Sequence, residues 1–362
     1  MSTSTKLSLP IAAALLAACA AFAHAQGIRP APSIPPAAKT GASAKPDTVV
    51  HLDVDVDTKA GEPIPGLTQS DFTLLDNNSA PSGVKFKAVA PGQGQQEVII
   101  LMDAVNSPFQ TVAYEQQQLE KFLKTKGATL PHPTTVAYVT DTGAQIQKGF
   151  TTNGVELEAS LEKIATGLRF LTRNAGYWGD TEQYTMSISA LQQVAGYCAQ
   201  LPGRKLVIWV SPGWPLLSGV RTELDGKQEA DVFRDIVAFS TALRVAHVTL
   251  DNVNPRGVNE SILRDYYYQE FTKGVSKLSD VYLGDLSLQV LATQSGGTVV
   301  ESDNDIAQSV ARLMNATTSW YEFDYPMPVT EQANQYHHVE VKVDKPGAKV
   351  TTRDGYYDQP SK

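Results

Sequence analysis

Cysteine is scarce in this sequence, which contains two cysteines among 362 residues. Cys19 lies in an N-terminal segment that we expect to be removed or lipidated, so Cys198 is the only thiol that the soluble part retains. A single thiol cannot form an intramolecular disulfide, even in an oxidising compartment. The stability of the protein therefore has to come from its hydrophobic core.

Positive charge is also in short supply, with 30 Lys and Arg against 38 Asp and Glu and a net charge of -8 at pH 7. No segment gathers basic residues into a patch, so the chain would repel a phosphate backbone and we expect no nucleic-acid partner. The apolar run Leu7–Phe22 is short for a transmembrane helix and has Pro10 near its start. We therefore expect no membrane span.

The sequence lacks the usual signatures of catalysis. No serine lies in a Gly-x-Ser-x-Gly elbow, and Gly92-Gln93-Gly94 precedes a strand, so it is a turn and not a phosphate-binding loop. Cys198 lies on the apolar face of a predicted helix, which favours a core residue over a nucleophile. We expect no enzymatic activity, with an enzyme of unrecognised site as an alternative.

Two other groups of polar residues are weak candidates for metal binding. Asp53, Asp55 and Asp57 resemble the start of a calcium loop, but Thr58 and Ile64 occupy the positions that need glycine and glutamate, so we predict a solvated strand face. His337 and His338 are adjacent in a predicted strand and point to opposite faces. We predict that these two histidines are structural or exposed.

The first 25 residues have the features of an export signal: Lys6, the apolar run after it, and Ala23-His24-Ala25 as a cleavage site before Gln26. We therefore expect a periplasmic or secreted protein. Leu16–Cys19 also has the form of a lipoprotein box, and the alternative is a lipoprotein anchored through Cys19. Lipidation there would be the only contact with a membrane.

Apolar periodicity divides the rest of the chain. Residues 26–47 are rich in Pro and Ala and predict a disordered spacer. Alternating patterns predict strands in an N-terminal β segment, 48–90, and a C-terminal one, 318–358. Between them, in 97–317, wholly apolar strands alternate with helices, which predicts a mostly parallel sheet with helices on both faces. We expect this α/β domain to be inserted in a small β-sandwich formed by the two β segments.

The loop after the first apolar strand, Asp103-Ala104-Val105-Asn106-Ser107, resembles the Asp-x-Ser-x-Ser loop of the von Willebrand factor A domain. The resemblance extends to a von Willebrand factor A-related family of exported bacterial proteins. Three segments carry it: Gly66–Asp76, Leu201–Ser211, and Lys345-Pro346-Gly347 together with Asp354–Tyr357. It covers about 48–357 and implies a von Willebrand A-type, Rossmann-like fold.

In that family the loop helps to hold a divalent cation, which implies Asp103, Ser107 and Thr185 as ligands, with Thr181 competing with Thr185. Two oxygen donors are missing, because Val105 replaces a serine and Pro212 replaces the final carboxylate. A cation such as Mg²⁺ needs about six oxygens, so we predict a degenerate metal site. On this interpretation Asp103 and Ser107 cap the following helix.

The function we expect is that of an exported, non-catalytic, protein-binding or adhesion-type module. Its candidate ligand-binding residues are the strand-end residues Asp103, Asn106, Ser107, Thr185 and Ser211. The partner would be an unknown protein or another component of the cell envelope. The alternative is a metal-dependent adhesion or assembly factor that binds Mg²⁺ through Asp103, Ser107 and Thr185.

The long stretch after Asn254 contains Tyr266-Tyr267-Tyr268 and Phe271. Exposed aromatic residues would supply an interface for a partner. We favour the simpler prediction, that these aromatics pack on the edge of the domain.

Overall fold

The computed structural model describes residues 48–358, apart from 127–128, 166–176, 217–220, 222, 256–266, 302–304 and 329–333. All described residues fall within one compact unit of the chain, residues 34–362. The predicted export signal, Cys19 and the spacer lie outside the described residues, as does Tyr266. Among the helices that are described, none has the length and apolar character needed to cross a membrane.

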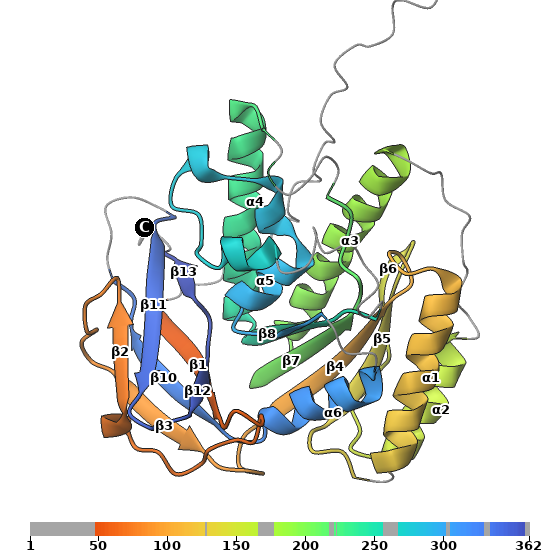
Figure 1. Cartoon of the computed structure of the whole chain (residues 1–362), viewed down its shortest axis with the longest axis horizontal. Coiled ribbons are helices and arrows are strands. Elements are labelled where there is room, and N and C mark those ends of the chain that lie inside the picture. Colours follow the sequence, from red (N-terminus) through yellow and green to blue (C-terminus); the bar gives the residue numbers. More distant parts are fainter. Residues whose placement is uncertain are drawn as a thin grey trace, which may run out of the picture. The chain divides into compact units, whose positions relative to one another are not determined.

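A six-stranded sheet forms the centre of the α/β domain (Figure 1). Its strands, in spatial order, are β6 (Gly143–Ile146), β5 (Thr134–Thr140), β4 (Gln96–Asp103), β7 (Arg204–Val210), β8 (Val248–Val253) and β9 (Val299–Val300). All neighbours are parallel except β5 and β6. Numbered along the domain, the order is 3-2-1-4-5-6, which is that of a doubly wound fold.

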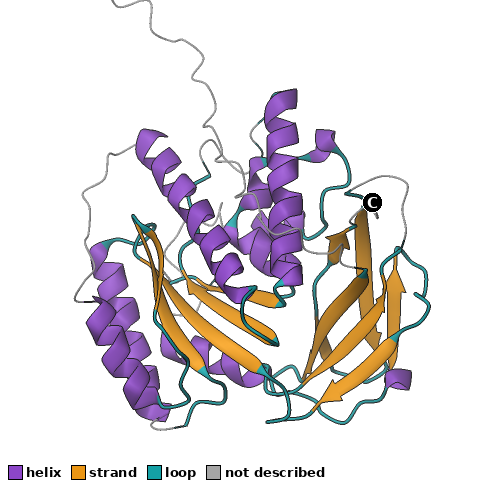
Figure 2. Cartoon of the chain, turned by 180° about the vertical axis from the view of Figure 1, so that it is seen from behind, coloured by secondary structure: helices purple, strands orange, loops and turns teal. Residues whose placement is uncertain are grey.

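Helices cover both faces of this sheet (Figure 2). The helices of one face are α1 (Phe109–Lys126), α2 (Gly154–Ala165) and α6 (Ile306–Ala316). Those of the other face are α3 (Tyr177–Cys198), α4 (Gly226–Val245) and α5 (Leu288–Gln294). The 3₁₀ helices are η1 (Gln69–Asp71), η3 (Tyr267–Phe271), η4 (Leu278–Asp280) and η5 (Leu283–Leu286).

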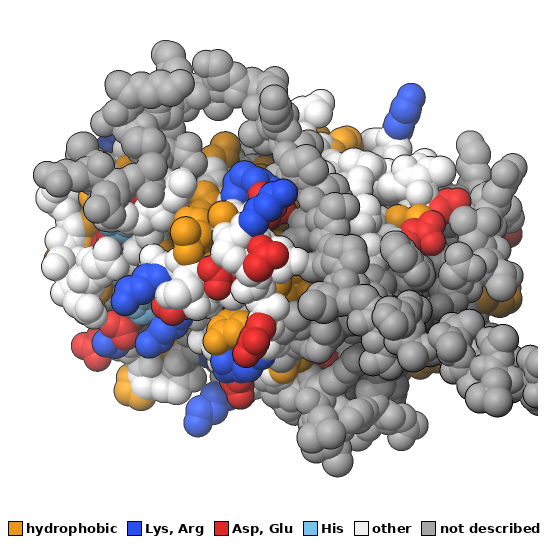
Figure 3. All heavy atoms as spheres, turned by 90° about the horizontal axis from the view of Figure 1, so that it is seen from above, with side chains coloured by type: hydrophobic (Ala, Val, Ile, Leu, Met, Phe, Trp, Pro, Cys, Tyr) orange, Lys and Arg blue, Asp and Glu red, His pale blue; other side chains and the backbone are white. Residues whose placement is uncertain are grey.

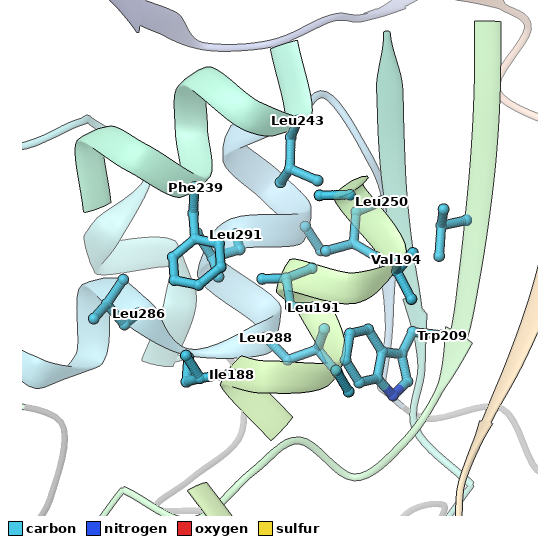
Figure 4. Close-up of a cluster of buried hydrophobic side chains, with 14 of the residues drawn as sticks. Ile188, Leu191, Val194, Trp209, Phe239, Leu243, Leu250, Leu286, Leu288 and Leu291 are labelled. Carbon is cyan, nitrogen blue, oxygen red and sulfur yellow. The ribbon is translucent and has the colours of Figure 1, made fainter. Parts of the chain in front are cut away.

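The apolar strands have no alternation because each strand buries both faces. Ile99 and Leu101 of β4 pack with α3, α4 and α5, whereas Val98 and Ile100 pack with α1, α2 and α6. Figure 4 shows the first of these cores, where Leu191 of α3 and Phe239 of α4 surround Trp209 and Leu250 of the sheet. Cys198 is fully buried in the same core as a free thiol.

The N-terminal and C-terminal segments pair with each other in two antiparallel sheets. One has the order β12 (Lys349–Thr351), β1 (Val49–Asp57), β10 (Trp320–Pro326) and β3 (Lys85–Val89). The other has the order β13 (Gly355–Tyr357), β11 (Tyr336–Val343) and β2 (Phe72–Asp76). Their inner faces share one apolar core, so the predicted fold class, an α/β domain within a split β-sandwich, is confirmed.

Two of the family-like segments meet at one buried carboxylate, Asp76. Its Oδ2 accepts hydrogen bonds from the hydroxyls of Tyr356, at 2.6 Å, and Tyr325, at 3.1 Å, and its Oδ1 lies 2.8 Å from Nδ1 of His337. These bonds hold the pKa of Asp76 below its usual value, although burial opposes them. Asp76, at the end of the first segment, therefore bonds to Tyr356 of the third segment, and this contact stabilises the β-sandwich.

The Pro-Gly-Arg-Lys turn of the remaining segment also has a structural role. Gly203 has φ of +69°, and a Cβ there would lie 2.4 Å from the carbonyl oxygen of Gln95, so only glycine fits. Lys205 donates from Nζ to the carbonyls of Leu201 and Gly203, which closes the turn. Arg204 is left to form a buried bidentate ion pair with Asp55 of β1.

The prediction of a solvated acidic face on β1 was wrong. Asp55 and Asp57 are only 5% and 7% exposed, because this face packs against the α/β domain, where Arg204 compensates the charge of Asp55. His337 is buried against Asp76, and Nδ1 of His338 lies 3.0 Å from the carbonyl oxygen of Asp354. These two histidines are structural, as predicted.

Two strand boundaries also differ from the predictions. The segment Ala246–Leu250 predicts a strand that ends at Leu250, but β8 continues to Val253, where Asp251 accepts from the amide of Thr298 and Nδ2 of Asn252 donates to the carbonyl oxygen of Trp209. The apolar and aromatic residues of Val350–Tyr357 predict one last strand, but the structure has two, β12 and β13, which belong to different sheets.

The aromatic segment packs on the domain, as we favoured. Tyr268 and Phe271 are buried against Val290 of α5. The hydroxyl of Tyr267 donates to Gln289 of the same helix. These three aromatic side chains therefore stabilise the edge of the domain.

Candidate strand-end site

The order of the sheet reverses between β4 and β7, and ligands of doubly wound folds bind outside the carboxyl ends of strands at such a point. Asp103 is the last residue of β4, and Ser211 directly follows β7. The fold therefore brings these two predicted site residues together. The Oγ of Ser211 donates to Oδ2 of Asp103 over 2.7 Å.

The carboxylate of Asp103 is fully buried and accepts hydrogen bonds from five donors. Its Oδ1 accepts from the backbone amides of Val105 and Asn106, both at 2.9 Å. Its Oδ2 accepts from Nδ2 of Asn106 at 2.8 Å, from Nε1 of Trp209 at 3.3 Å, and from Ser211. An ionised carboxylate offers about four lone-pair directions, so the protein itself uses the whole capacity of this group.

A second layer of hydrogen bonds fixes these donors. Nδ2 of Asn106 also donates to Oγ of Ser187 on α3, at 2.9 Å. Oγ of Ser211 accepts from the amide of Gly213, and Nδ2 of Asn252 donates to the carbonyl oxygens of Trp209 and Ser211. The donors are therefore held in place around Asp103 and are not free to turn towards a ligand.

The other predicted site residues are placed differently. Ser107 is buried, and its hydroxyl donates to Oε1 of Glu115 on α1 at 3.0 Å. Helix α3 presents Ser187 to Asn106. Thr185 lies two residues earlier on the same helix and therefore about 200° around its axis. The hydrogen bonds of Asp103 end at Asn106, three residues before α1 begins, so Asp103 stabilises the loop and does not cap the helix.

These residues do not fit a divalent cation. Hydrogen-bond donors already use the lone pairs of both oxygens of Asp103, so none is left for a cation. Val105 supplies no side-chain oxygen, and Pro212 stands where a carboxylate would be needed. A cation that entered would have to displace the bonds from Asn106 and Ser211 to Asp103, and Pro212 offers it no second acidic ligand.

Sequence patterns missed three residues of this network: Ser187, Trp209 and Asn252. Trp209 lies within an apolar strand, so the sequence pattern indicates only that its ring is packed in the core. It does not indicate that the indole N–H donates to Asp103. A signal for Asn252 existed, because it lies only two residues after Leu250, the end of a predicted central strand, and a buried polar residue there has to find hydrogen bonds. No sequence spacing identifies Ser187 over Thr185.

Aromatic side chains are exposed close to the strand-end loop. Phe109, the first residue of α1, is 60% exposed, and Tyr114, five residues further along the same helix, is 39% exposed. Tyr114 also lines a shallow depression of about 500 Å³ on α1 together with Gln110 and Gln117. Large exposed aromatics of this kind are enriched at protein interfaces.

One face of the molecule shows how the charged side chains are distributed on it. On the face seen in Figure 3, basic and acidic side chains lie next to one another among small hydrophobic areas. A nucleic-acid site would need basic residues gathered on one face. The mixture is typical of an ordinary solvent-exposed surface.

Cys198 has no feature of a nucleophile. Burial raises the pKa of its thiol to about 12, which removes the reactive thiolate at neutral pH. The residue fills space in the core at the end of α3, as the sequence predicted.

A separate cavity of about 290 Å³ lies between β1 and β8 and is lined by Asp57 and Asp251. Burial raises the pKa of Asp57 to about 6 and that of Asp251 to about 7. Asp251 accepts a hydrogen bond from the amide of Thr298, and Lys349 also lines the cavity. Asp57 belongs to the acidic group that the sequence pattern placed on a solvated strand face, and no sequence motif indicated Asp251.

The buried carboxyls predict a stability that falls as the pH rises. Burial raises the pKa of Asp251, Asp285 and Asp354 to about 7, so the folded state holds their protons more tightly than the unfolded state does. Their contribution is fully present below about pH 4 and is lost as the pH rises through about 7. We expect the free energy of unfolding to fall between pH 5 and pH 8 by up to about 3 kcal/mol for each of these carboxyls, measured by urea denaturation. The Asp251→Asn variant should flatten this slope, whereas the exposed Asp344→Asn should not; an unchanged slope in Asp251→Asn would contradict the prediction.

Comparison with known proteins leaves the family open. No protein-family model matches the chain, and no curated protein matches it. Among solved structures, the chain is similar to the human COPII-coat protein Sec24c, with a TM-score of 0.35 and 8% identity over 78% of this chain and 47% of that one. The chain thus spans less than half the length of the Sec24c chain.

Two further structures give similar values. The N-terminal domain of TFIIH p34 has a TM-score of 0.32 and 11% identity over 61% of this chain and 96% of that one. A mutant of the PilB minor pilin from Streptococcus sanguinis has a TM-score of 0.34 and 11% identity over 74% of this chain and 78% of that one. Likeness at this level carries no functional conclusion, and the fold class rests on the observed strand order.

Proposed function

We propose that this protein is an exported, non-catalytic binding module that holds a protein or cell-envelope partner at its strand-end face without a metal ion. It would belong to the von Willebrand factor A-related family of exported bacterial proteins that its sequence resembles. The observation that carries the proposal is the saturated carboxylate of Asp103, which turns the position of a metal ligand into a structural support for the loop.

The surface next to that loop supplies the rest of the argument. Phe109 and Tyr114 place exposed aromatic area beside a rigid, hydrogen-bonded turn. Aromatic anchors on a rigid support contribute much of the free energy of binding at protein interfaces. Export, by cleavage before Gln26 or by lipidation at Cys19, would bring this face to an envelope partner.

The test is capture of a partner from envelope extract by the mature chain, with and without EDTA. We expect one specific partner to be retained in EDTA and to be lost, by at least about tenfold, when Phe109 and Tyr114 are both changed to serine. Val155→Ser, at an equally exposed position on α2, is the matched control. A partner that dissociates in EDTA would favour the metal-dependent adhesion factor, and the absence of any specific partner would count against a binding module.

A further inference from the structure

A second polar cluster lies where β1 meets the α/β domain, away from the strand-end site. His51 and Asp53 come from β1, and His247 lies between α4 and β8. One ligand atom from each lies within 4.8 Å of the other two, and Nε2 of His51 is 3.2 Å from Oδ1 of Asp53. These residues line a small cavity of about 10 Å³, which is room for one water molecule or one ion.

The spacing of these atoms fits a tetrahedral metal. Two ligands at 2.0–2.1 Å from zinc lie about 3.3 Å apart in that geometry, close to the separation of His51 and Asp53. Since the three ligand atoms lie within 4.8 Å of one another, the gap that His247 has to close to complete the set of three protein ligands is at most about 1.5 Å. A water molecule would supply the fourth position.

The second shell is already in place. Nδ1 of His51 lies 2.5 Å from Oδ1 of Asp324, which orients the ring so that Nε2 points to Asp53. Histidines that bind metals commonly donate their other ring nitrogen to a carboxylate in this way. The Nε of Arg204 lies 4.0 Å from Oδ2 of Asp53, so Arg204 acts on this carboxylate through its charge and not through a hydrogen bond.

The backbone of His247 has the left-handed conformation that is common at the residue after a helix C-cap, here Ala246 of α4, and this conformation positions its ring. Its φ is +52°, in the left-handed region that few residues other than glycine adopt. Its amide donates to the carbonyl of Arg244 and its carbonyl accepts from the amide of Lys205, so both neighbours hold the strained conformation. This conformation brings the ring to 4.4 Å from that of His51, measured between centroids.

We propose that His51, Asp53 and His247 bind one transition-metal ion, with Zn²⁺ as the best match, and that Asp324 supports the site from the second shell. Two imidazoles with one carboxylate select zinc-like ions over Mg²⁺ or Ca²⁺, which prefer oxygen ligands. The ion would link the N-terminal β segment to the α/β domain, because His51 and Asp53 belong to the first and His247 to the second. This site is independent of the function proposed for the strand ends.

The surrounding charges set the expected affinity. Arg204, Arg244 and Arg353 lie around the cluster, and the carboxylates of Asp53, Asp55 and Asp324 balance them. A metal ion that binds His51 has to compete with a proton for the ring nitrogen, and the nearby arginines repel a cation. We therefore expect micromolar binding and not the nanomolar binding of a site without cations nearby.

The test is titration of the chelator-treated full chain, purified without a polyhistidine tag, with Zn²⁺ in a competition assay and with Co²⁺ by visible absorption. We expect one ion per chain, with the strong absorption of four-coordinate Co²⁺, and a melting temperature that Zn²⁺ raises. His247→Ala should weaken Zn²⁺ binding by at least about 30-fold, and Asp324→Asn by about 10-fold. His338→Ala, a histidine outside the cluster, should leave it unchanged.

Two results would overturn the proposal: no saturable Zn²⁺ binding below about 100 μM, or equal affinity in the chain and in His247→Ala. Circular dichroism of the metal-free variants provides the check on folding. If His247→Ala does not fold, Asp324→Asn decides, because its side chain is 41% exposed and its replacement leaves the core intact. An unchanged affinity in that variant then contradicts the site.

Discussion

Replacement of Asp103 by alanine is expected to destabilise the protein by about 4 kcal/mol or more, even in the complete absence of metal ions. The change removes the acceptor of five hydrogen bonds and leaves buried donors of Asn106, Trp209 and Ser211 without it. Each unsatisfied buried donor costs about 1–3 kcal/mol, and the loop can relax to recover only part of this. Urea denaturation in EDTA measures the loss.

This experiment also distinguishes the two views of the site. In a vacant metal site, removal of an acidic ligand relieves an unpaired negative charge, so stability would be unchanged or improved. Ser211→Ala removes one of the five donors and should cost only about 1–2 kcal/mol. Equal stability of Asp103→Ala and the unmodified protein in EDTA would show that the hydrogen bonds around Asp103 do not stabilise the fold.

Replacement of Arg204 by methionine is the second change with a large expected effect, about 3–5 kcal/mol. The Nη1 of Arg204 donates to Oδ1 of Asp55 at 2.7 Å, and both side chains are almost inaccessible to solvent. Methionine fills similar space but leaves the carboxylate of Asp55 buried without its cation. The guanidinium also lies 5.4 Å from the ring centroid of Trp320, so the change removes a contact with the C-terminal segment.

The double variant Arg204→Met, Asp55→Leu provides the control. Replacing both members of a buried ion pair by apolar residues is often neutral, so the double variant should regain most of the stability that the single variant loses. Urea denaturation of the chain and both variants measures the difference. A single variant that loses less than about 1 kcal/mol would show that the pair does not hold β1 against the α/β domain.

The sequence was sufficient to predict the fold class because the signals for it are local. A wholly apolar strand such as Val98–Met102 indicates burial on both faces, and alternation over Val339–Val343 indicates a sheet with one exposed face. Neither signal depends on which distant segment a strand meets. The prediction for the acidic side of β1 failed for that reason. Asp55 alternates with apolar residues as the residues of a solvated face do, and its partner Arg204 is 149 residues away in the sequence.

The candidate site was predicted in part. Asp103 and Ser211 follow apolar strands, and strands at the switch point of a doubly wound sheet end side by side, so their meeting was foreseeable. The donors that bond to the carboxylate of Asp103 were not foreseeable. The indole of Trp209 and the hydroxyl of Ser187, which belong to this network, are positioned by packing between elements. The His51 and His247 cluster was invisible for the same reason, since it joins residues from two segments that only the folded chain brings together.

The central claim, that the strand-end site stabilises a loop and holds no metal, is tested most directly by calorimetric titration with Mg²⁺ and Mn²⁺. The titration is best made on the His247→Ala variant, so that the proposed His and Asp site does not contribute heat. The saturated carboxylate predicts no saturable binding below millimolar concentration, and the same trace after Asp103→Asn. Saturable micromolar binding of Mg²⁺ that Asp103→Asn abolishes would contradict the claim.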